Sequence, residues 1–320
     1  MVRDWAGVVK SERLLRIIGS NYLTQKIAAR LGTKYNRLRD RRLFRSRIDG
    51  IDPSEYVETS SQPKLNVIIL VVDSLRNSRL SCNGYFRKTT PFLDSVKTRF
   101  TAISASPWTY PSVASILTGL YPHNHNAVAG GIVKHVKNFE SFAKLRHDIL
   151  TLPEILYLLG YRIHFVTAIE MAYLPLRARV VPERHDGTTR ADALFERLMR
   201  WITKKSERQF AYVHLADLHL PLKPPDNFRN FFGDVRDLPK IDIRNRWRPE
   251  DWRSSNEELR ERIENWELLY DNTLRYVDSA IERLFLFLEK AGLVDHTIVV
   301  VTSDHGEEFL EHAEFEAKTF

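Results

Sequence analysis

Three short, largely apolar runs constrain the fold of this chain more than any other feature. They cover residues 66–72, 210–215 and 297–302, they are rich in β-branched or aromatic residues, and acidic and imidazole side chains follow each of them. Continuous apolar runs of this length are typical of strands that are buried on both faces of a parallel sheet. The sequence therefore predicts a parallel sheet with core strands at these three places.

Segments with helical signals separate the predicted strands. Pro residues that can open helices, Gly residues that can end them and amphipathic spacing predict helices over 91–96, 109–117, 151–160, 191–202 and 257–291. A further strand is expected over 163–167, and residues 222–255 are expected to form a long irregular connection. This alternation indicates an α/β fold, with a doubly wound, mostly parallel sheet and helices on both faces.

Length and composition place limits on the class of protein. With 320 residues and 43% hydrophobic residues, the chain is long enough for one large α/β domain plus an appendage. The single cysteine, Cys82, excludes an intramolecular disulfide framework and a cysteine-based zinc cluster. We see no segment apolar enough for a signal peptide or a membrane span. We therefore expect a cytoplasmic protein, either soluble or peripheral to the membrane.

The first 62 residues predict a basic, mostly helical appendage and linker, followed by the main domain over 63–320. Apolar residues recur at helical spacing over 14–31, and six arginines follow over 37–47. One interpretation is an amphipathic helical appendage that packs on the domain or on a partner. The other is contact with a phosphate-rich surface, a membrane or a nucleic acid. We expect no specific nucleic-acid partner, and the sequence carries no signal for an oligomeric state.

Polar side chains stand where the predicted strands end. Asp73 follows the first apolar run, and Asp304 and His305 follow the last. Ligands of open α/β sheets bind at the carboxyl ends of the strands. A single Asp at such a place is also a common helix cap. Adjacent Asp and His, however, offer an oxygen and an imidazole to one divalent ion, for which Mn²⁺, Ca²⁺, Mg²⁺ and Zn²⁺ are all candidates.

Thr109 is the candidate nucleophile. It stands two residues before Pro111, where a helix is expected to begin. A Thr hydroxyl at this place is also a good helix N-cap. In the functional interpretation, the helix N-terminus favours an anionic ester group. A metal ion bound to the Thr oxygen would lower the hydroxyl pKa and activate it for attack.

Other polar residues are candidates for contacts with a substrate. His219, in the segment 217–221, is placed to donate a proton to a substrate oxygen or to the leaving group. Asp217 is a candidate substrate-binding residue beside it. His123 and His125 are further candidates, with an exposed loop as the alternative interpretation.

Taken together, these segments resemble the N-terminal catalytic domain of the sulfatase family, within the alkaline phosphatase superfamily. The resemblance covers roughly residues 64–316 and rests on the order and spacing of several short motifs. These motifs lie at 66–76, 84–85, 90–94, 109–112, 117–119, 214–219, 270–271, 276–278 and 302–307.

The resemblance implies a metal-dependent hydrolase or transferase that acts on sulfate or phosphate esters. Carried over residue by residue, it implies Asp73, Asp304 and His305 as metal ligands, together with the oxygen of Thr109. It implies Thr109 as the nucleophile and His219 as a contact to a substrate oxygen or the leaving group.

Three positions depart from the family pattern. Sulfatases carry a Cys or Ser at the place of Thr109, where it is converted to formylglycine. Oxidation of Thr would give a ketone, so no formylglycine is expected here. Val113 replaces a family Arg, and Ser74 replaces the second residue of an Asp-Asp pair. The pattern is more similar to the branch that uses an unmodified Thr and one divalent ion, which includes phosphoglycerol and phosphoethanolamine transferases and phosphodiesterases.

The resemblance also implies further strands and helices after the segment 304–307, and we expect the family's C-terminal part to be lacking before the sequence ends at Phe320. The function expected is hydrolysis of an anionic sulfate or phosphate ester through a covalent intermediate on Thr109. One alternative is a transferase at a membrane face, in contact with it through the basic N-terminus. The other is a truncated, metal-binding pseudoenzyme.

Overall fold

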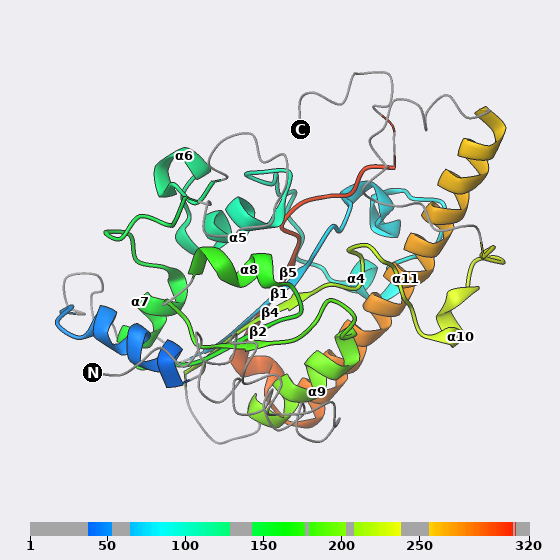
Figure 1. Ribbon diagram of the computed structural model, residues 1–320. Coiled ribbons are helices and arrows are strands. Elements are labelled where there is room, and N and C mark those ends of the chain that lie inside the picture. Colours follow the sequence, from blue (N-terminus) through cyan, green and yellow to red (C-terminus); the bar gives the residue numbers. More distant parts are fainter. Residues whose placement is uncertain are drawn as a thin grey trace, which may run out of the picture.

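The computed structural model describes residues 38–52, 65–128, 143–176, 179–202, 208–237, 256–309 and 311. A five-stranded sheet lies at its centre, with the strand order β3-β2-β4-β1-β5 and every pair parallel (Figure 1). Its strands are β1 (Asn66–Val72), β2 (Arg162–Thr167), β3 (Pro182–Arg184), β4 (Gln209–Leu215) and β5 (Thr297–Thr302).

The register brings the carboxyl ends of three central strands to the same level. Val72 at the end of β1 pairs with Leu215 at the end of β4, and Val71 pairs with Thr302 at the end of β5. Side chains that follow these strands therefore meet at one edge of the sheet. That edge is where the sequence predicted a ligand site.

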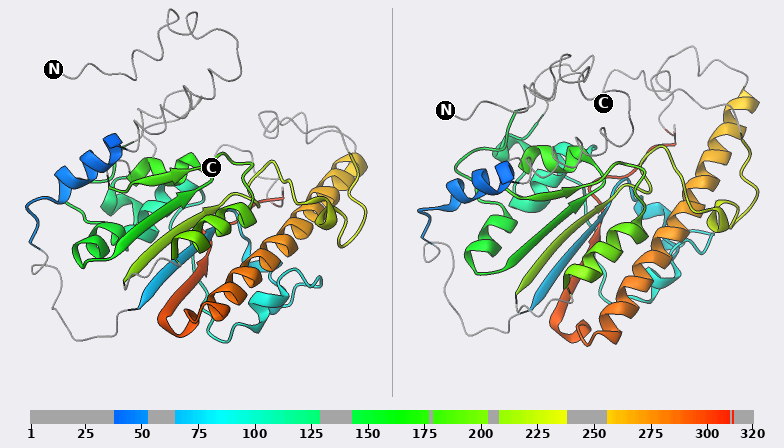
Figure 2. Two further views of the ribbon diagram at one scale, coloured as in Figure 1. Left: turned by 90° about the horizontal axis from the view of Figure 1, so that it is seen from below. Right: turned by 60° about the horizontal axis from the view of Figure 1, so that its bottom comes forward.

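Helices cover both faces of the sheet, which confirms the doubly wound α/β prediction (Figure 2). On one face lie α5 (Thr109–Thr118), α7 (Leu152–Leu158) and α8 (Glu170–Tyr173). On the other lie α9 (Ala191–Ile202) and α11 (Asn256–Lys290).

The continuous apolar run of β1 is explained by these two cores. Ile69 and Val71 pack in the core beneath α5, whereas Ile68, Leu70 and Val72 pack in the core beneath α9 and α11. Because successive side chains of a strand point to opposite faces, a strand covered on both sides needs apolar residues at every position.

A helical segment over 38–48 is attached to the domain by buried contacts. The ring of Phe44 lies edge-on to Tyr157 of α7, with the centroids 4.9 Å apart. The Arg47 guanidinium pairs with the buried carboxylate of Glu154 and donates to the carbonyl oxygens of His147 and Ile149 at 2.9 and 2.8 Å. This part of the predicted appendage thus packs on the domain, while residues 1–37 and 53–64 lie outside the described residues.

Several short elements were not predicted: β3, α6 (Pro122–His125), α8 and α10 (Asp226–Arg229). Helix α10 begins within the connection expected to be irregular, of which residues 238–255 lie outside the described residues. β5 forms an edge of the described sheet, and on one of its faces Ile298 and Val300 are 47% and 42% exposed, since no described element covers them. Among the described helices, none combines the length and the apolar character that a membrane crossing requires.

Candidate active site

Three buried side chains meet at the carboxyl edge of the sheet. Asp73 follows β1, His214 is the penultimate residue of β4, and Asp304 stands two residues after β5. The Nε2 atom of His214 lies 3.3 Å from Asp73 Oδ2 and 3.7 Å from Asp304 Oδ2. One ligand atom from each of the three side chains falls within 4.8 Å of the other two, so they could share one metal ion.

Thr109 and His305 complete a cluster of five side chains, which we call the carboxyl-edge cluster. The Thr109 hydroxyl donates to Asp73 Oδ2 at 3.3 Å and lies 3.2 Å from His305 Nε2. His305 Nε2 is also 3.6 Å from Asp73 Oδ1 and 3.5 Å from Asp304 Oδ2. The structure thus brings together all four residues that the sequence proposed as metal ligands.

The Thr109 hydroxyl is not used as a helix cap. Thr109 is the first residue of α5, the N-cap position belongs to Trp108, and no side chain caps this helix. The hydroxyl instead faces Asp73 and His305. Of the two interpretations of this residue, the geometry favours the one in which its oxygen takes part in the site.

Hydrogen bonds hold the turn that presents Asp73. Ser74 adopts a left-handed conformation, with φ of 61°, and its hydroxyl donates to Asp73 Oδ1 at 2.9 Å. The Tyr270 hydroxyl, from α11, donates to the Ser74 carbonyl at 2.7 Å and accepts from the Arg76 amide at 3.0 Å. A left-handed non-glycine residue costs about 1–3 kcal/mol and persists only where its surroundings hold it in place. Tyr270 supplies that support.

The buried carboxylates of the cluster perturb each other and the imidazoles. Burial alone would raise the pKa of Asp73, but its hydrogen bond to His214 and the charges of nearby histidines hold that pKa below its usual value. Burial and the neighbouring Asp73 charge raise the pKa of Asp304. Burial opposes protonation of His305, yet the two carboxylates raise its pKa. The cluster therefore favours additional positive charge.

The donor atoms fit a bound divalent cation. Asp304 Oδ2 is buried and has no hydrogen-bond partner among the described residues. His305 Nδ1 donates to the Gly306 carbonyl at 2.7 Å, which leaves the Nε2 lone pair facing the carboxylates. Ligand bonds of about 2.1 Å around one ion place neighbouring donor atoms roughly 3.4 Å apart, close to the separations in the cluster.

His219 lies near the cluster but outside it. It is exposed, its Nδ1 donates to the Leu220 carbonyl at 2.8 Å, and its charge contributes to the lowered pKa of Asp73. The neutral ring then has an Nε2 lone pair that can take up a proton and return it. This position and chemistry fit the contact to a substrate oxygen or leaving group that the sequence predicted.

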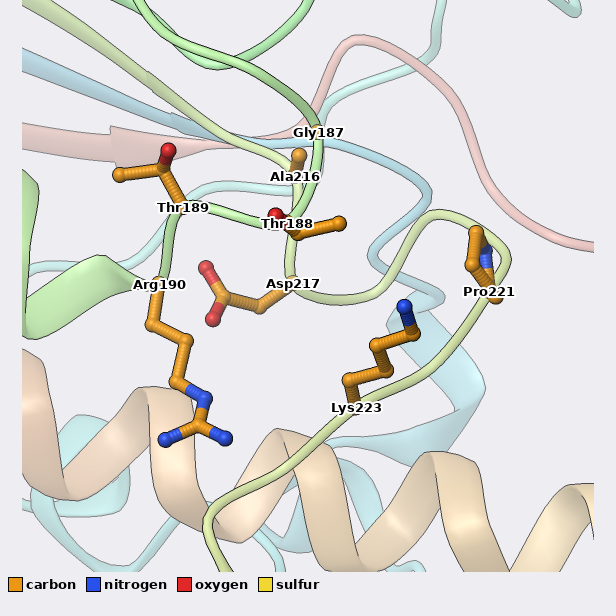
Figure 3. A pocket seen from close by; sticks show the side chains of 8 residues that line it. All are labelled: Gly187, Thr188, Thr189, Arg190, Ala216, Asp217, Pro221 and Lys223. Carbon is orange, nitrogen blue, oxygen red and sulfur yellow. The ribbon is translucent and has the colours of Figure 1, made fainter. Parts of the chain in front are cut away.

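Asp217 caps a helix rather than joining the cluster. Its Oδ1 accepts from the Ala191 amide in the first turn of α9 at 3.2 Å. Figure 3 shows its carboxylate directed at the segment of Thr189 and Arg190 that leads into α9, in a pocket also lined by Lys223. A role of Asp217 in substrate binding stays a prediction.

His123 and His125 belong to α6 and are not brought into the cluster. His125 is fully buried, where its Nδ1 accepts from the Ala127 amide at 3.0 Å and its Nε2 lies 3.0 Å from the Ser115 hydroxyl. His123 is exposed and stacks on Tyr121. These contacts give His125 a structural role, and substrate binding by either residue stays a prediction.

The family model that is described as Sulfatase matches residues 65–319, about four fifths of the chain. The chain belongs to the sulfatase family. Arylsulfatase K from Bos taurus is 24% identical over 301 residues, which cover 78% of this chain and 54% of that protein. The chain therefore spans about half the length of this curated relative.

Solved structures of the superfamily share the fold. The C-terminal periplasmic domain of EptC from Escherichia coli, in complex with Zn, has a TM-score of 0.54 at 19% identity, over 80% of this chain and 67% of that one. The phosphonate monoester hydrolase of Agrobacterium radiobacter has a TM-score of 0.54 at 15% identity, over 77% of this chain and 63% of that one.

Two departures from the sulfatase pattern have visible structural consequences. Val113 is fully buried in the core between α5 and the sheet, so this helix presents an apolar side chain where the family pattern has an arginine. The Ser74 hydroxyl donates to Asp73 and adds no second carboxylate there. His214, by contrast, was not proposed as a site residue. Its signal was an imidazole at the end of an otherwise apolar strand.

The pocket of Asp217 yields a stability prediction. Burial, above all, raises the pKa of Asp217 to about 7, whereas that of an Asp in an unfolded chain is about 3.9. The folded protein therefore keeps a proton that the unfolded chain releases, and stability falls as the pH rises from about 4 to about 7. Asp217→Asn keeps an acceptor for the Ala191 amide without a charge. We expect it to stabilise the protein by about 2–4 kcal/mol at pH 8, and less as the pH falls toward 4.

Urea unfolding of the variant and its parent at several pH values measures this difference. The substitution Asp226→Asn, in the exposed first turn of α10, serves as the control and should give no such gain. An Asp217→Asn protein that is less stable than its parent at pH 8 contradicts the prediction.

Proposed function

We propose that this protein is a metal-dependent hydrolase of sulfate or phosphate esters in which the Thr109 hydroxyl is the nucleophile. The observation that carries the proposal is the position of that hydroxyl. It begins a helix without capping it, and it lies 3.2–3.3 Å from Asp73 and His305 among the donor atoms of the carboxyl-edge cluster. Membership of the sulfatase family supports the same class of chemistry.

A divalent cation would be held by Asp73, Asp304 and His305, together with the Thr109 oxygen. When bound, such an ion supplies positive charge that polarises the ester and favours the deprotonated Thr hydroxyl. No formylglycine is invoked, because oxidation of a Thr side chain gives a ketone and not an aldehyde.

The residues of the site allow a balanced two-step reaction. The Thr109 oxygen forms a bond to phosphorus or sulfur and its proton passes to Asp73, which already accepts its hydrogen bond. The bond from phosphorus or sulfur to the alcohol oxygen breaks, and protonated His219 gives its proton to that oxygen. In the second step, neutral His219 takes a proton from water, which attacks the Thr109 ester and releases phosphate or sulfate. The Thr109 oxygen regains its proton from Asp73.

The charge of the cluster favours esters with one negative charge. Two carboxylates balance a divalent cation, and neutral imidazoles add nothing, so little positive charge is left for a substrate. Val113 supplies none where the family pattern has an arginine. Sulfate monoesters and phosphate diesters carry one charge, whereas phosphate monoesters carry nearly two at neutral pH. We therefore favour the first two as substrates.

Replacing Thr109 tests the nucleophile. We expect Thr109→Ala to lower kcat/KM by at least about 1,000-fold, and Thr109→Ser, which keeps the hydroxyl, to stay within about tenfold of the parent. The assay is release of p-nitrophenol from p-nitrophenyl sulfate, p-nitrophenyl phosphate and bis-p-nitrophenyl phosphate, with Zn²⁺, Mn²⁺, Mg²⁺ or Ca²⁺. Mass spectrometry after rapid quenching should find the covalent group on Thr109. Equal activity of the Ala variant and the parent contradicts the proposal, and a protein that binds metal but turns over no ester is the pseudoenzyme.

Replacing His219 tests the proton donor. An alkoxide leaving group needs protonation far more than p-nitrophenolate does. We therefore expect His219→Gln to lower kcat/KM by about 100-fold or more for an alkyl ester, and by about tenfold or less for the p-nitrophenyl ester. His296→Gln is the matched control, because His296 is exposed just before β5, at the opposite edge of the sheet. Equal losses for the two esters would argue against proton donation by His219.

A transferase that acts at a membrane face is the second candidate, and one observation favours it. The helical segment over 38–48 is held to the domain by Phe44 and Arg47, and its remaining face is exposed. That outward face carries three arginines and two apolar residues: Leu38, Arg41, Arg42, Leu43 and Arg45. Basic and apolar residues on one helix face are the pattern of helices that lie on anionic membranes. We propose this face as the membrane contact.

Vesicle sedimentation tests the membrane contact. Replacing Arg41, Arg42 and Arg45 with Gln should weaken binding to phosphatidylglycerol vesicles by about 100-fold at low salt, because each arginine near an anionic surface contributes separately. Binding to phosphatidylcholine vesicles should be weak for parent and variant alike. Three exposed basic residues elsewhere, replaced together by Gln, form the control: Lys97, Arg283 and Lys290. Equal vesicle binding by the parent and the first variant contradicts the proposal.

A further inference from the structure

We propose that His214 is a metal ligand, so that the carboxyl-edge cluster holds its cation with two carboxylates and two imidazoles. The sequence and the family pattern supplied one imidazole, that of His305. A second imidazole would make the site select Zn²⁺ over Mg²⁺ and Ca²⁺. The inference concerns the metal centre of the proposed hydrolase, but it is tested through metal binding and not through turnover.

The position of His214 in the sheet carries the inference. β4 is paired on one side with β1 and on the other with β2, and all seven of its residues are buried. His214 is fully buried, and its Nε2 lies between the carboxylates, 3.3 Å from Asp73 Oδ2 and 3.7 Å from Asp304 Oδ2. A side chain in the middle of a sheet has little freedom to turn away. The structure therefore holds this nitrogen beside both acidic ligands.

Tyr212 orients the His214 ring. The Tyr212 hydroxyl lies 2.8 Å from His214 Nδ1, two residues earlier on the same face of β4. Tyr212 is itself fully buried and stacks on Phe165 of β2, with the ring centroids 4.5 Å apart. Histidines that bind metals usually have their other ring nitrogen hydrogen-bonded, which fixes the tautomer and the ring orientation. When Nδ1 donates its proton to the Tyr212 oxygen, the Nε2 lone pair faces Asp73 and Asp304.

A lone pair in that place requires a cation. Three acceptor atoms at these distances, two of them on carboxylates, repel each other unless a proton or a metal ion lies among them. Asp304 Oδ2, which is buried without a hydrogen-bond partner, leaves room for the second solution. Imidazole nitrogen suits Zn²⁺, whereas Mg²⁺ and Ca²⁺ are bound almost only by oxygen. The donor set therefore matches zinc better than the alkaline-earth ions.

Two substitutions and a matched control test the role of His214. We expect His214→Gln to raise the Kd of Zn²⁺ for the metal-free protein by more than 100-fold, and Tyr212→Phe, which removes only the orienting hydroxyl, to raise it by about tenfold. His164→Gln is the control, because His164 lies on β2 and stacks on Trp201. It should leave the Kd within about twofold. Competition of Zn²⁺ with a chelator measures the Kd, and circular dichroism of each metal-free variant confirms folding.

Spectroscopy of the unaltered protein gives a second, independent readout. X-ray absorption fine structure of the zinc-loaded protein should show two imidazoles on the metal, and Co²⁺ in the same site should give intense visible bands that weaken and shift in His214→Gln. One imidazole on zinc, or a Kd and a Co²⁺ spectrum that do not change in a folded His214→Gln protein, overturns the inference. Either result would make His214 a hydrogen-bonding support of Asp73. Neither outcome depends on whether the protein hydrolyses any ester.

Discussion

The burial of two carboxylates side by side is the constraint on which the rest of this site depends. Parallel pairing of β1 with β5 brings Asp73 and Asp304 to the same edge of the sheet, and both are almost fully buried. Like charges in such surroundings are unfavourable unless positive charge or hydrogen bonds compensate them. The imidazoles of His214 and His305 supply part of that compensation. The amino terminus of α5, with Thr109 as its first residue, adds the favourable end of a helix dipole.

Much of the fold could be predicted because its main signal is local. The run that predicted a strand over 66–72 forms β1 with the same bounds, and the amphipathic stretch over 191–202 forms α9. A strand covered on both faces needs apolar residues throughout, and a surface helix needs an apolar stripe, so either pattern reveals its element. The three-residue β3 and the four-residue α6 and α8 were missed, since so few residues show no periodicity. They follow from the packing around them.

Asp217 and His214 show where sequence reasoning about the site reaches its limit. Both are polar residues at or just beyond the end of β4. Asp217 was proposed as a substrate contact, but the path of the chain beyond β4 brings it to the start of α9, where it accepts from the Ala191 amide. No local pattern shows that path. His214 was treated as part of a strand, yet the period of two places it on the same face as Tyr212, beneath α5. That parity could be read from the sequence once the helix carrying Thr109 was assigned to the same face.

The departures from the sulfatase pattern are consistent with each other in electrostatic terms. Ser74 stands where the pattern has a second aspartate, and Val113 stands where it has an arginine, so the site loses one negative and one positive charge together. The aspartate is replaced by a hydroxyl that donates to Asp73, and the arginine by a valine that packs in the core beneath α5. A cation held by two carboxylates needs ligands that bring no further charge. Neutral imidazoles meet that need, and both histidines of the cluster lie within 3.7 Å of each of its carboxylates.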